Sequence, residues 1–367
     1  MRSKRSQLVV WWCAGLLWFP SAGFGDDPPA VDKRPLVICS AAQDKKLVLF
    51  RLNSNDGTLE PAGSVATPGE PGALAVTPDG TRLMVGLRST GQLMGFRFDK
   101  QTGLPVAKNV VEAGADPAQI SVDATGRYLF TAYYVAGKVS VHAIADDGSL
   151  SPQALQEVPT LERAHAIVAS PSGKQWYVPH TGPNTIFQFD WDAGTRRLTP
   201  HDPPRVDRPA STGPRHMVWH PSRPVAFTSD EQGMSVTPYV VDERGSLVPG
   251  KSVPTLDQPF DGPRSTAEIK VHPSGRFVYC SNRGPDSLAI LRVDETGRNL
   301  SLVGTHPTER TPRSFDIDPA GTWLLSAGEA SGQLRVSRID RETGRLSDVG
   351  RYSVGPRLWW VMVVDSR

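Results

Sequence analysis

The sequence predicts an all-β fold, a seven-bladed β-propeller whose blades are four-stranded antiparallel sheets. Three observations support this prediction. Turn signals recur at a period of about 46 to 52 residues, which is the length of one propeller blade. An apolar strand precedes each turn and another follows it. The composition, with 34 Gly and 33 Pro in 367 residues, suits a chain with many turns.

Each repeat contains the elements of one blade. The turns between its first two strands lie at 77–80, 123–126, 170–173, 220–223, 272–275 and 318–321. A third strand follows, and most of these end on Asp, as at Asp99, Asp190 and Asp294. A glycine turn then introduces the fourth strand, at Gly57, Gly148, Gly245 and Gly344. Four antiparallel strands at this period form a propeller blade.

The two ends of the chain together supply a seventh blade. Residues 35–65 contain three strands but lack an innermost one, and residues 358–365 form a strand without a partner. Pairing the C-terminal strand with the N-terminal blade closes the ring and removes the exposed sheet edges. We therefore predict one seven-bladed domain over residues 36–367.

The N-terminus has the pattern of a secretory signal. Arg2, Lys4 and Arg5 precede an apolar run from Leu8 to Phe19, and small residues follow. The run is shorter than the roughly 20 residues that span a bilayer, which favours a cleaved signal over residues 1–25. We expect a disordered leader at 26–35 and an exported protein, periplasmic or secreted, with no membrane contact after cleavage.

Charge and cysteine content limit the partners, disulfides and metal sites that the sequence predicts. A formal net charge of +2 gives no reason to expect nucleic acid as a partner. Cys39 and Cys280 fall in blades that are not neighbours, so we expect two unpaired, mostly buried thiols. No Cys/His set has metal-ligand spacing. We expect no metal, no cofactor and a monomer.

Alignment of the repeats gathers polar residues at one mouth of the channel. Eight residues before the fourth position of each turn, the sequence has Gly72, Ala118, His165, Arg215, Ala267 and Arg313. Eight residues after it stand Arg88, Tyr134, Thr181, Glu231, Arg283 and Glu329. The two positions of one hairpin end at the same edge of the sheet. Arg215 and Glu231 should therefore converge, with His216 and Glu268 beside the first column.

Several arginines at one rim suit a small anionic substrate, because a guanidinium binds carboxylate or phosphate through two hydrogen bonds. Glu231 or His165 could activate a water molecule there. The residues leave open which of the two is the base. A structural interpretation is also open, in which Arg215 and Glu231 only brace their blade.

Several segments resemble the lactonase family of seven-bladed propellers, and most closely the propeller type of 6-phosphogluconolactonase. They are residues 213–221 (Gly-Pro-Arg-His-Met-Val-Trp-His-Pro) with Glu231, residues 267–283 ending in Ser-Asn-Arg, residues 311–315, 138–141 and 350–355. The resemblance covers nearly all of 36–364. It implies a metal-independent lactonase whose site uses His165, Arg215, Glu231 and Arg283, with Arg88 and Arg313 at further family positions.

Further residues are expected to contact the substrate. We assign Arg88, Tyr134, Arg313 and Glu268 to substrate binding. The family often has Ala-Asn-Tyr-Gly where this chain has Ala132-Tyr-Tyr-Val135, so Tyr133 and Val135 should alter the rim.

The favoured hypothesis is hydrolysis of a small, sugar-derived lactone to its hydroxy acid. Two alternatives belong to other classes. One is a non-catalytic extracytoplasmic propeller that binds carbohydrate or protein, since this fold hosts many binding modules. The other is a muconate-lactonizing cycloisomerase, because the lactonase family also includes such enzymes.

Overall fold

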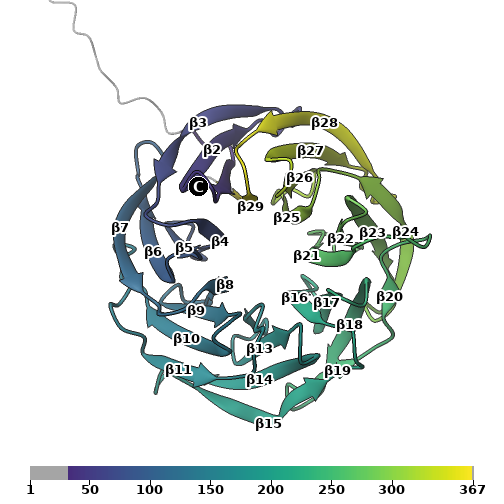
Figure 1. Ribbon diagram of the computed structural model, residues 1–367, viewed down its shortest axis with the longest axis horizontal. Helices are drawn as coiled ribbons and strands as arrows, with labels where there is room; N and C mark the ends of the chain where they lie inside the picture. Colours follow the sequence, from purple (N-terminus) through teal and green to yellow (C-terminus); the bar gives the residue numbers. More distant parts are fainter. Residues whose placement is uncertain (1–31, 366–367) are drawn as a thin grey trace, which may run out of the picture. The chain divides into compact units, whose positions relative to one another are not determined.

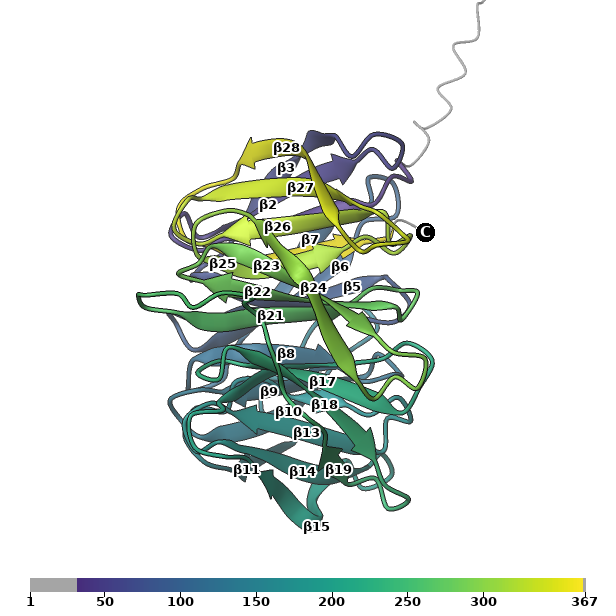
Figure 2. The same cartoon turned by 90° about the vertical axis from the view of Figure 1, so that its right-hand side faces the viewer.

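A ring of seven antiparallel sheets forms the domain, in a computed structural model that describes residues 32–365 (Figure 1). The predicted all-β propeller is confirmed, and the described residues contain no helix. In the side view the strands run from one face of the ring to the other (Figure 2). The predicted signal, residues 1–25, lies outside the described residues, as does most of the predicted leader. Its last four residues form no strand, and Arg34 pairs with Glu60 at 2.7 Å.

Blades 1 to 4 follow the chain from its N-terminus, each given from the channel outward. Blade 1 contains β29 (Leu358–Val364), β1 (Leu36–Ala41), β2 (Lys46–Leu52) and β3 (Leu59–Ala66). Blade 2 contains β4 (Pro71–Val76), β5 (Arg82–Leu87), β6 (Gln92–Phe98) and β7 (Pro105–Glu112). Blade 3 contains β8 (Pro117–Val122), β9 (Tyr128–Tyr133), β10 (Lys138–Ala143) and β11 (Gln156–Pro159). Blade 4 contains β12 (Val168–Ala169), β13 (Gln175–His180), β14 (Thr185–Asp192) and β15 (Arg197–Asp207).

Blades 5 to 7 complete the ring. Blade 5 contains β16 (Pro214–Trp219), β17 (Val225–Asp230), β18 (Ser235–Val241) and β19 (Leu247–Pro249), and β20 (Val253–Pro254) also pairs with β18. Blade 6 contains β21 (Ser265–Val271), β22 (Phe277–Arg283), β23 (Ser287–Val293) and β24 (Leu300–Pro307). Blade 7 contains β25 (Pro312–Ile317), β26 (Trp323–Gly328), β27 (Gln333–Ile339) and β28 (Leu346–Ser353).

The C-terminal strand closes the ring as predicted. β29 pairs antiparallel with β1, with Cys39 opposite Val361 and Leu36 opposite Val364. The purple N-terminal strands therefore lie beside the yellow C-terminal strand (Figure 1). β1 thus has a partner on each side, β2 and β29, and is not an exposed edge.

Burial is greatest in the second strand of each blade and lowest in the outermost strand. The second strands, such as β1, β9 and β26, are buried at every position. They lie inside a blade and between two neighbouring blades, so both faces need apolar side chains. Outermost strands such as β7 and β28 carry mostly exposed residues, because only one face contacts protein.

The apolar core is divided among the blade interfaces. Seven buried clusters occur among residues 32–365, and each joins the side chains of two adjacent blades. The cluster at the closure joins Val37 and Cys39 of blade 1 to Leu325 and Val336 of blade 7, with Leu358 of β29 among them. Cys39 and Cys280 are both free and buried, as predicted.

Tyrosines of the second strands link blade 4 to blade 5 and blade 6 to blade 7. Tyr177 and Tyr279 donate to the carbonyl oxygens of Gly245 and Gly344 at 2.6 and 2.8 Å. These glycines introduce the outermost strands of the following blades. Gly344 has a φ of 74°, and a Cβ there would lie 2.5 Å from the Phe277 ring. The repeated glycine turn therefore gives room for the aromatic residue of the preceding blade.

Truncating the closing strand should weaken the whole ring. Leu358 is fully buried in the cluster between blades 1 and 7. We expect Leu358→Ala to lower the free energy of unfolding in urea by about 2 to 5 kcal/mol. The matched variant Leu161→Ala, at a 38% exposed leucine, should change it by less than about 0.5 kcal/mol. Equal effects of the two variants would show that packing at the ring closure does not contribute to the free energy of unfolding more than a surface leucine does.

Candidate active site

A β-bulge near the start of six of the seven innermost strands, all except β12, directs side chains into the channel. In β16 the pairing with β17 shifts between Pro214 and Met217, so that Arg215 and His216 occupy an interval in which β17 has one residue. Corresponding shifts occur in β4, β8, β21, β25 and β29. A bulge inserts one unpaired residue and re-aims its side chain.

The bulges contain the first column predicted from the sequence. Gly72, Ala118, Arg215, Ala267 and Arg313 all lie within these shifts. His165 precedes the short β12, and its amide donates to the Pro179 carbonyl at 2.9 Å. The bulge of β29 adds a seventh member, Trp359, which the sequence analysis missed.

A signal for these bulges exists in the sequence. In four blades a proline directly precedes the column position: Pro71, Pro117, Pro214 and Pro312. Proline lacks an amide hydrogen, so within sheets it is confined to edges, strand starts and bulges. Trp359 has no proline directly before it. Its strand is not followed by one of the repeated turns, so an alignment on those turns does not include it.

The second column lies at the end of the second strands, as predicted. Arg88, Tyr134, Glu231 and Glu329 directly follow β5, β9, β17 and β26, and Arg283 is the last residue of β22. Both columns contribute to one pocket. Its lining includes Gly72, Ala118, His165, Arg215, Arg313, Trp359 and Arg88.

Three of the four arginines in the two columns have a carboxylate partner. Arg283 pairs with Glu231 at 2.6 Å, Arg88 with Asp116 at 3.3 Å and Arg313 with Glu329 at 3.4 Å. The Glu231 pair joins blades 5 and 6. Sequence reasoning had placed Glu231 with Arg215, but the hydrogen bond goes to Arg283 on the neighbouring blade.

Arg215 differs from the other three arginines. Its side chain is 1% exposed and makes no hydrogen bond or ion pair with any residue of 32–365, and its Nε and Nη1 atoms are buried. Burial lowers the pKa of Arg215 to about 9, and the charges of Arg283 and Arg313 add to this effect. A buried cation without a carboxylate favours binding of an anion, which would satisfy its free donors.

Glu231 and His165 differ in protonation. Burial alone would raise the pKa of Glu231, but Arg215 and Arg283 outweigh it and lower that pKa, so the carboxylate is ionised at neutral pH. Burial lowers the pKa of His165 well below its usual value, and the charge of Arg215 lowers it further. His165 is therefore a neutral imidazole. Its ring contacts Tyr134 edge-on, with centroids 5.5 Å apart.

Trp359 forms the opposite wall from blade 1. The guanidinium carbons of Arg313, Arg88 and Arg357 lie 5.4, 5.6 and 4.5 Å from its ring centroid. Cation–π contacts of this kind hold arginines in place while leaving their in-plane donors free. The indole nitrogen donates to Glu329 at 2.8 Å. One tryptophan therefore fixes both the arginine rim and a carboxylate.

Of the residues predicted at or beside the rim, Tyr133 and Glu268 are buried, whereas Val135 is exposed. Tyr133 is fully buried, and its hydroxyl is 2.8 Å from Ser140 Oγ, so it belongs to the core of blade 3. Val135 is 76% exposed and does lie on the surface. Glu268, predicted to bind substrate, is 4% exposed, and its Oε1 lies 3.0 Å from His216 Nδ1. Its role in substrate binding stays a prediction.

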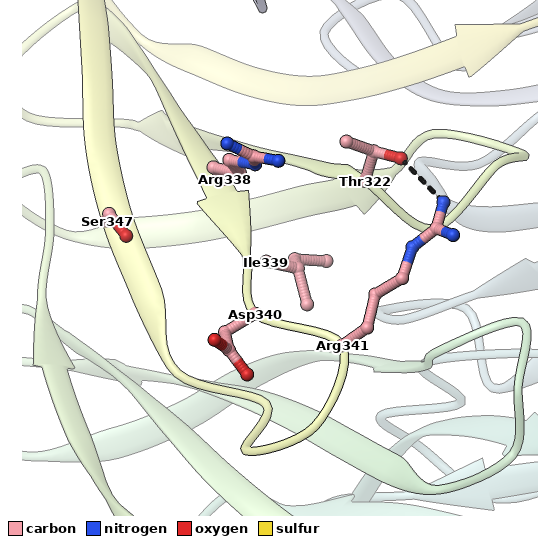
Figure 3. A pocket seen from close by; sticks show the side chains of 6 residues that line it. All are labelled: Thr322, Arg338, Ile339, Asp340, Arg341 and Ser347. Atoms are coloured by element: carbon pink, nitrogen blue, oxygen red, sulfur yellow. Dashed lines mark hydrogen bonds between the residues drawn. The ribbon is translucent and has the colours of Figure 1, made fainter.

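A second hollow lies within blade 7, away from both columns. Thr322, Arg338, Asp340, Arg341 and Ser347 are among the residues that line it, and Arg341 donates to Thr322 at 3.2 Å (Figure 3). It contains no buried titratable side chain, whereas the channel pocket gathers several. Residues 32–365 include no group of three or more His, Cys, Asp or Glu side chains that could hold a metal ion. They also include no helix long and apolar enough to cross a membrane.

Comparison with known proteins agrees with this arrangement. Residues 36–363 match the family model described as lactonase, seven-bladed β-propeller. The chain belongs to this lactonase family.

Relatives in the family share nearly the full length of the chain. A 6-phosphogluconolactonase of Serratia proteamaculans (strain 568) is 34% identical over 334 residues, covering 90% of this chain and 99% of the relative. One from Pectobacterium carotovorum is 32% identical, with 90% and 98% coverage. The solved structure of a periplasmic gluconolactonase of Pseudomonas aeruginosa superposes with a TM-score of 0.84 at 25% identity, covering 91% and 99%. The lactonase propeller therefore accounts for all of the described domain.

The unpaired guanidinium should make the pocket an anion site. We expect inorganic phosphate at ten times its Kd to stabilise the protein by about 1.4 kcal/mol, raising Tm by about 2 °C. Arg215→Ala should abolish this shift. The control Arg276→Ala removes an exposed arginine paired with Glu342 at 3.1 Å and should retain it. A shift that survives in Arg215→Ala would mean that phosphate binds elsewhere.

Proposed function

We propose that this protein is a 6-phosphogluconolactonase-like lactonase, a carboxylic-ester hydrolase that opens a small sugar-derived lactone to its hydroxy acid. The observation that carries the proposal is Arg215, a buried guanidinium without a carboxylate partner on the floor of the pocket. Lactone hydrolysis develops a negative charge on the carbonyl oxygen. Fixed donors in a site shielded from water stabilise such a charge strongly. The names of the family relatives support the same chemistry.

The oxyanion is held by Arg215 with help from Arg283. Arg283 spans from Glu231 to the Thr266 carbonyl, at 2.6 and 3.1 Å, which fixes the plane of its guanidinium. Glu231 thus orients Arg283 and partly balances the charge of Arg215. Both donors are in place before the substrate arrives, so little reorganisation is needed in the transition state.

His165 is the general base in this proposal, and Glu231 is not. The Glu231 carboxylate accepts a 2.6 Å hydrogen bond from Arg283 and serves to orient that guanidinium. His165 is neutral, lines the same pocket and can accept a proton from water. Water then attacks the carbonyl carbon. As the ring C–O bond breaks, the imidazolium returns the proton to the leaving alkoxide.

The wall formed by Trp359, Tyr134, Arg88 and Arg313 receives the rest of the substrate. The flat Trp359 ring suits the apolar face of a sugar ring. Arg88 and Arg313 have long contacts to their carboxylates, 3.3 and 3.4 Å, which leaves donors for hydroxyl groups or an anionic substituent. Both a phosphorylated and an unphosphorylated lactone fit this chemistry.

We further propose that the protein is exported, periplasmic or secreted, and acts as a monomer. The basic residues Arg2, Lys4 and Arg5 followed by the apolar run Leu8–Phe19 support export. Because phosphorylated gluconolactone is a cytoplasmic metabolite, export favours an unphosphorylated sugar lactone. The Pseudomonas relative, described as a periplasmic gluconolactonase, supports this choice. No observation favours a non-catalytic binding module or a cycloisomerase.

Substitution of the two central charges tests the proposal. We expect Arg215→Ala and Glu231→Gln each to lower the turnover of lactone at least about 100-fold. The first removes a donor to the oxyanion, and the second releases Arg283 from its fixed orientation. The measurement is acid release near neutral pH from gluconolactone and 6-phosphogluconolactone, with far-UV circular dichroism to check folding. Wild-type turnover in both variants would refute the assignment.

The surface variant Arg276→Ala is the matched control, since it removes an arginine outside the pocket. It should hydrolyse both lactones as fast as the wild-type protein. A comparable loss in this control would show that the effect of Arg215→Ala reflects general charge or stability rather than the site.

A further inference from the structure

A buried histidine–glutamate pair lies beneath the pocket. His216, which shares the bulge of β16 with Arg215, and Glu268, in the bulge of β21, are each 4% exposed. His216 Nδ1 lies 3.0 Å from Glu268 Oε1, which also accepts from the Ile269 amide at 3.1 Å. An ionised carboxylate only accepts hydrogen bonds, so Nδ1 of His216 carries the hydrogen. Its Nε2 is then an acceptor.

The ring of His216 lies next to the other histidine of the site. The rings of His216 and His165 are 5.0 Å apart between centroids and inclined by 63°. His216 Nε2 and His165 Nδ1 are both buried, and neither has a hydrogen-bond partner among the described residues. A buried polar atom left unpaired destabilises the folded protein. A water molecule that accepts a hydrogen from His165 Nδ1 and donates one to His216 Nε2 would satisfy both atoms.

We propose that His216 and Glu268 are positioning residues that hold His165 in the tautomer with hydrogen on Nδ1, leaving Nε2 free to accept a proton from water. The proposal rests on the proposed function, in which His165 is the general base. It extends that function by two buried residues that act through His165. Their role corresponds to that of the buried carboxylate behind the histidine in a Ser-His-Asp triad.

The charges around the histidines explain why such support is needed. Arg215, Arg313 and Arg88 face His165 and oppose its protonation. The charged and titratable groups that face His216 are Glu268 and Lys270 from β21, Arg215 from its own strand and His165. Lys270 is itself paired with Asp316 at 3.3 Å. Glu268 is therefore the negative charge in contact with His216, through which it can act on His165.

The proton balance of the step is simple. Water gives its proton to His165 Nε2 while its oxygen bonds to the lactone carbon. The hydrogen on His165 Nδ1 stays on its nitrogen and strengthens its hydrogen bond to the bridging water molecule. When the ring C–O bond breaks, the proton on Nε2 passes to the alkoxide. His165, His216 and Glu268 then return to their starting states.

Nitrogen NMR of protein labelled with ¹⁵N-histidine tests the proposal directly. The chain has eight histidines, and His165→Gln and His216→Gln variants assign the two resonances. In the wild-type protein near neutral pH we expect both residues to carry hydrogen on Nδ1 and none on Nε2. Glu268→Gln should shift His165 toward the form with hydrogen on Nε2. A wild-type His165 that already carries hydrogen on Nε2 would overturn the proposal without any variant.

Kinetics give the second readout. Glu268→Gln should lower kcat at least about 10-fold, as expected for a weakened general base, with KM within about 3-fold of the wild-type value. A residue that only supported the fold would instead lower Tm and leave kcat unchanged, and that result would overturn the proposal. The matched control is Asp190→Asn, which alters a similar pair in which His201 Nδ1 lies 2.9 Å from the carboxylate, away from the pocket. It should change neither kcat nor the His165 resonances.

The two readouts separate this proposal from the proposed function. The predicted tautomers in a protein that hydrolyses no lactone would refute the lactonase assignment and leave the His165–His216–Glu268 arrangement standing. Full activity with the opposite tautomer at His165 would refute the positioning role and leave the lactonase assignment standing.

Discussion

The β-bulge on the innermost strands is the constraint on which the site depends. A regular strand would alternate its side chains between the two faces of the blade, and both faces are needed for packing against neighbouring blades. The extra residue in the bulge releases one position from that alternation. Arg215, Arg313 and Trp359 reach the channel in this way, from three different blades.

The bulge is repeated in several blades, and the repeated bulges together form a pocket. Because the blades surround one channel, their bulges meet at a single mouth, where they combine with the residues that end the second strands. The bulge residues in several blades are small, as at Gly72 and Ala118, and they leave space for the large polar ones. The pocket thus arises from differences between equivalent positions of a repeated unit.

The four arginines of the two columns differ in whether they have a carboxylate partner. Arg88, Arg283 and Arg313 each have a carboxylate, while Arg215 has none. The carboxylates hold three guanidinium groups in fixed orientations, and the net positive charge is concentrated at the most buried one. This arrangement suits a reaction in which a single negative charge appears on a small substrate.

The sequence predicted the ring, its closure and both columns because each depends on a short-range pattern repeated at a fixed period. The sequence did not predict which arginine pairs with Glu231. Glu231 is close to Arg215 along one hairpin, yet it bonds to Arg283 of the next blade, and a contact between blades is not set by the pattern within one repeat. Trp359 escaped notice because its strand has no turn of its own. Tyr133 was assigned to the rim, but alternation along β9 directs it into the core.

The position of the lactone ring itself tests this account most directly. The measurement is a crystal structure of the complex with the δ-lactam of gluconic acid, a stable mimic whose ring nitrogen replaces the ring oxygen. The account predicts that the lactam carbonyl oxygen lies about 2.7 to 3.1 Å from guanidinium nitrogens of Arg215 and Arg283, with the sugar ring against Trp359. A lactam bound in the hollow of blade 7 near Arg338, or one whose carbonyl points away from Arg215, would contradict it.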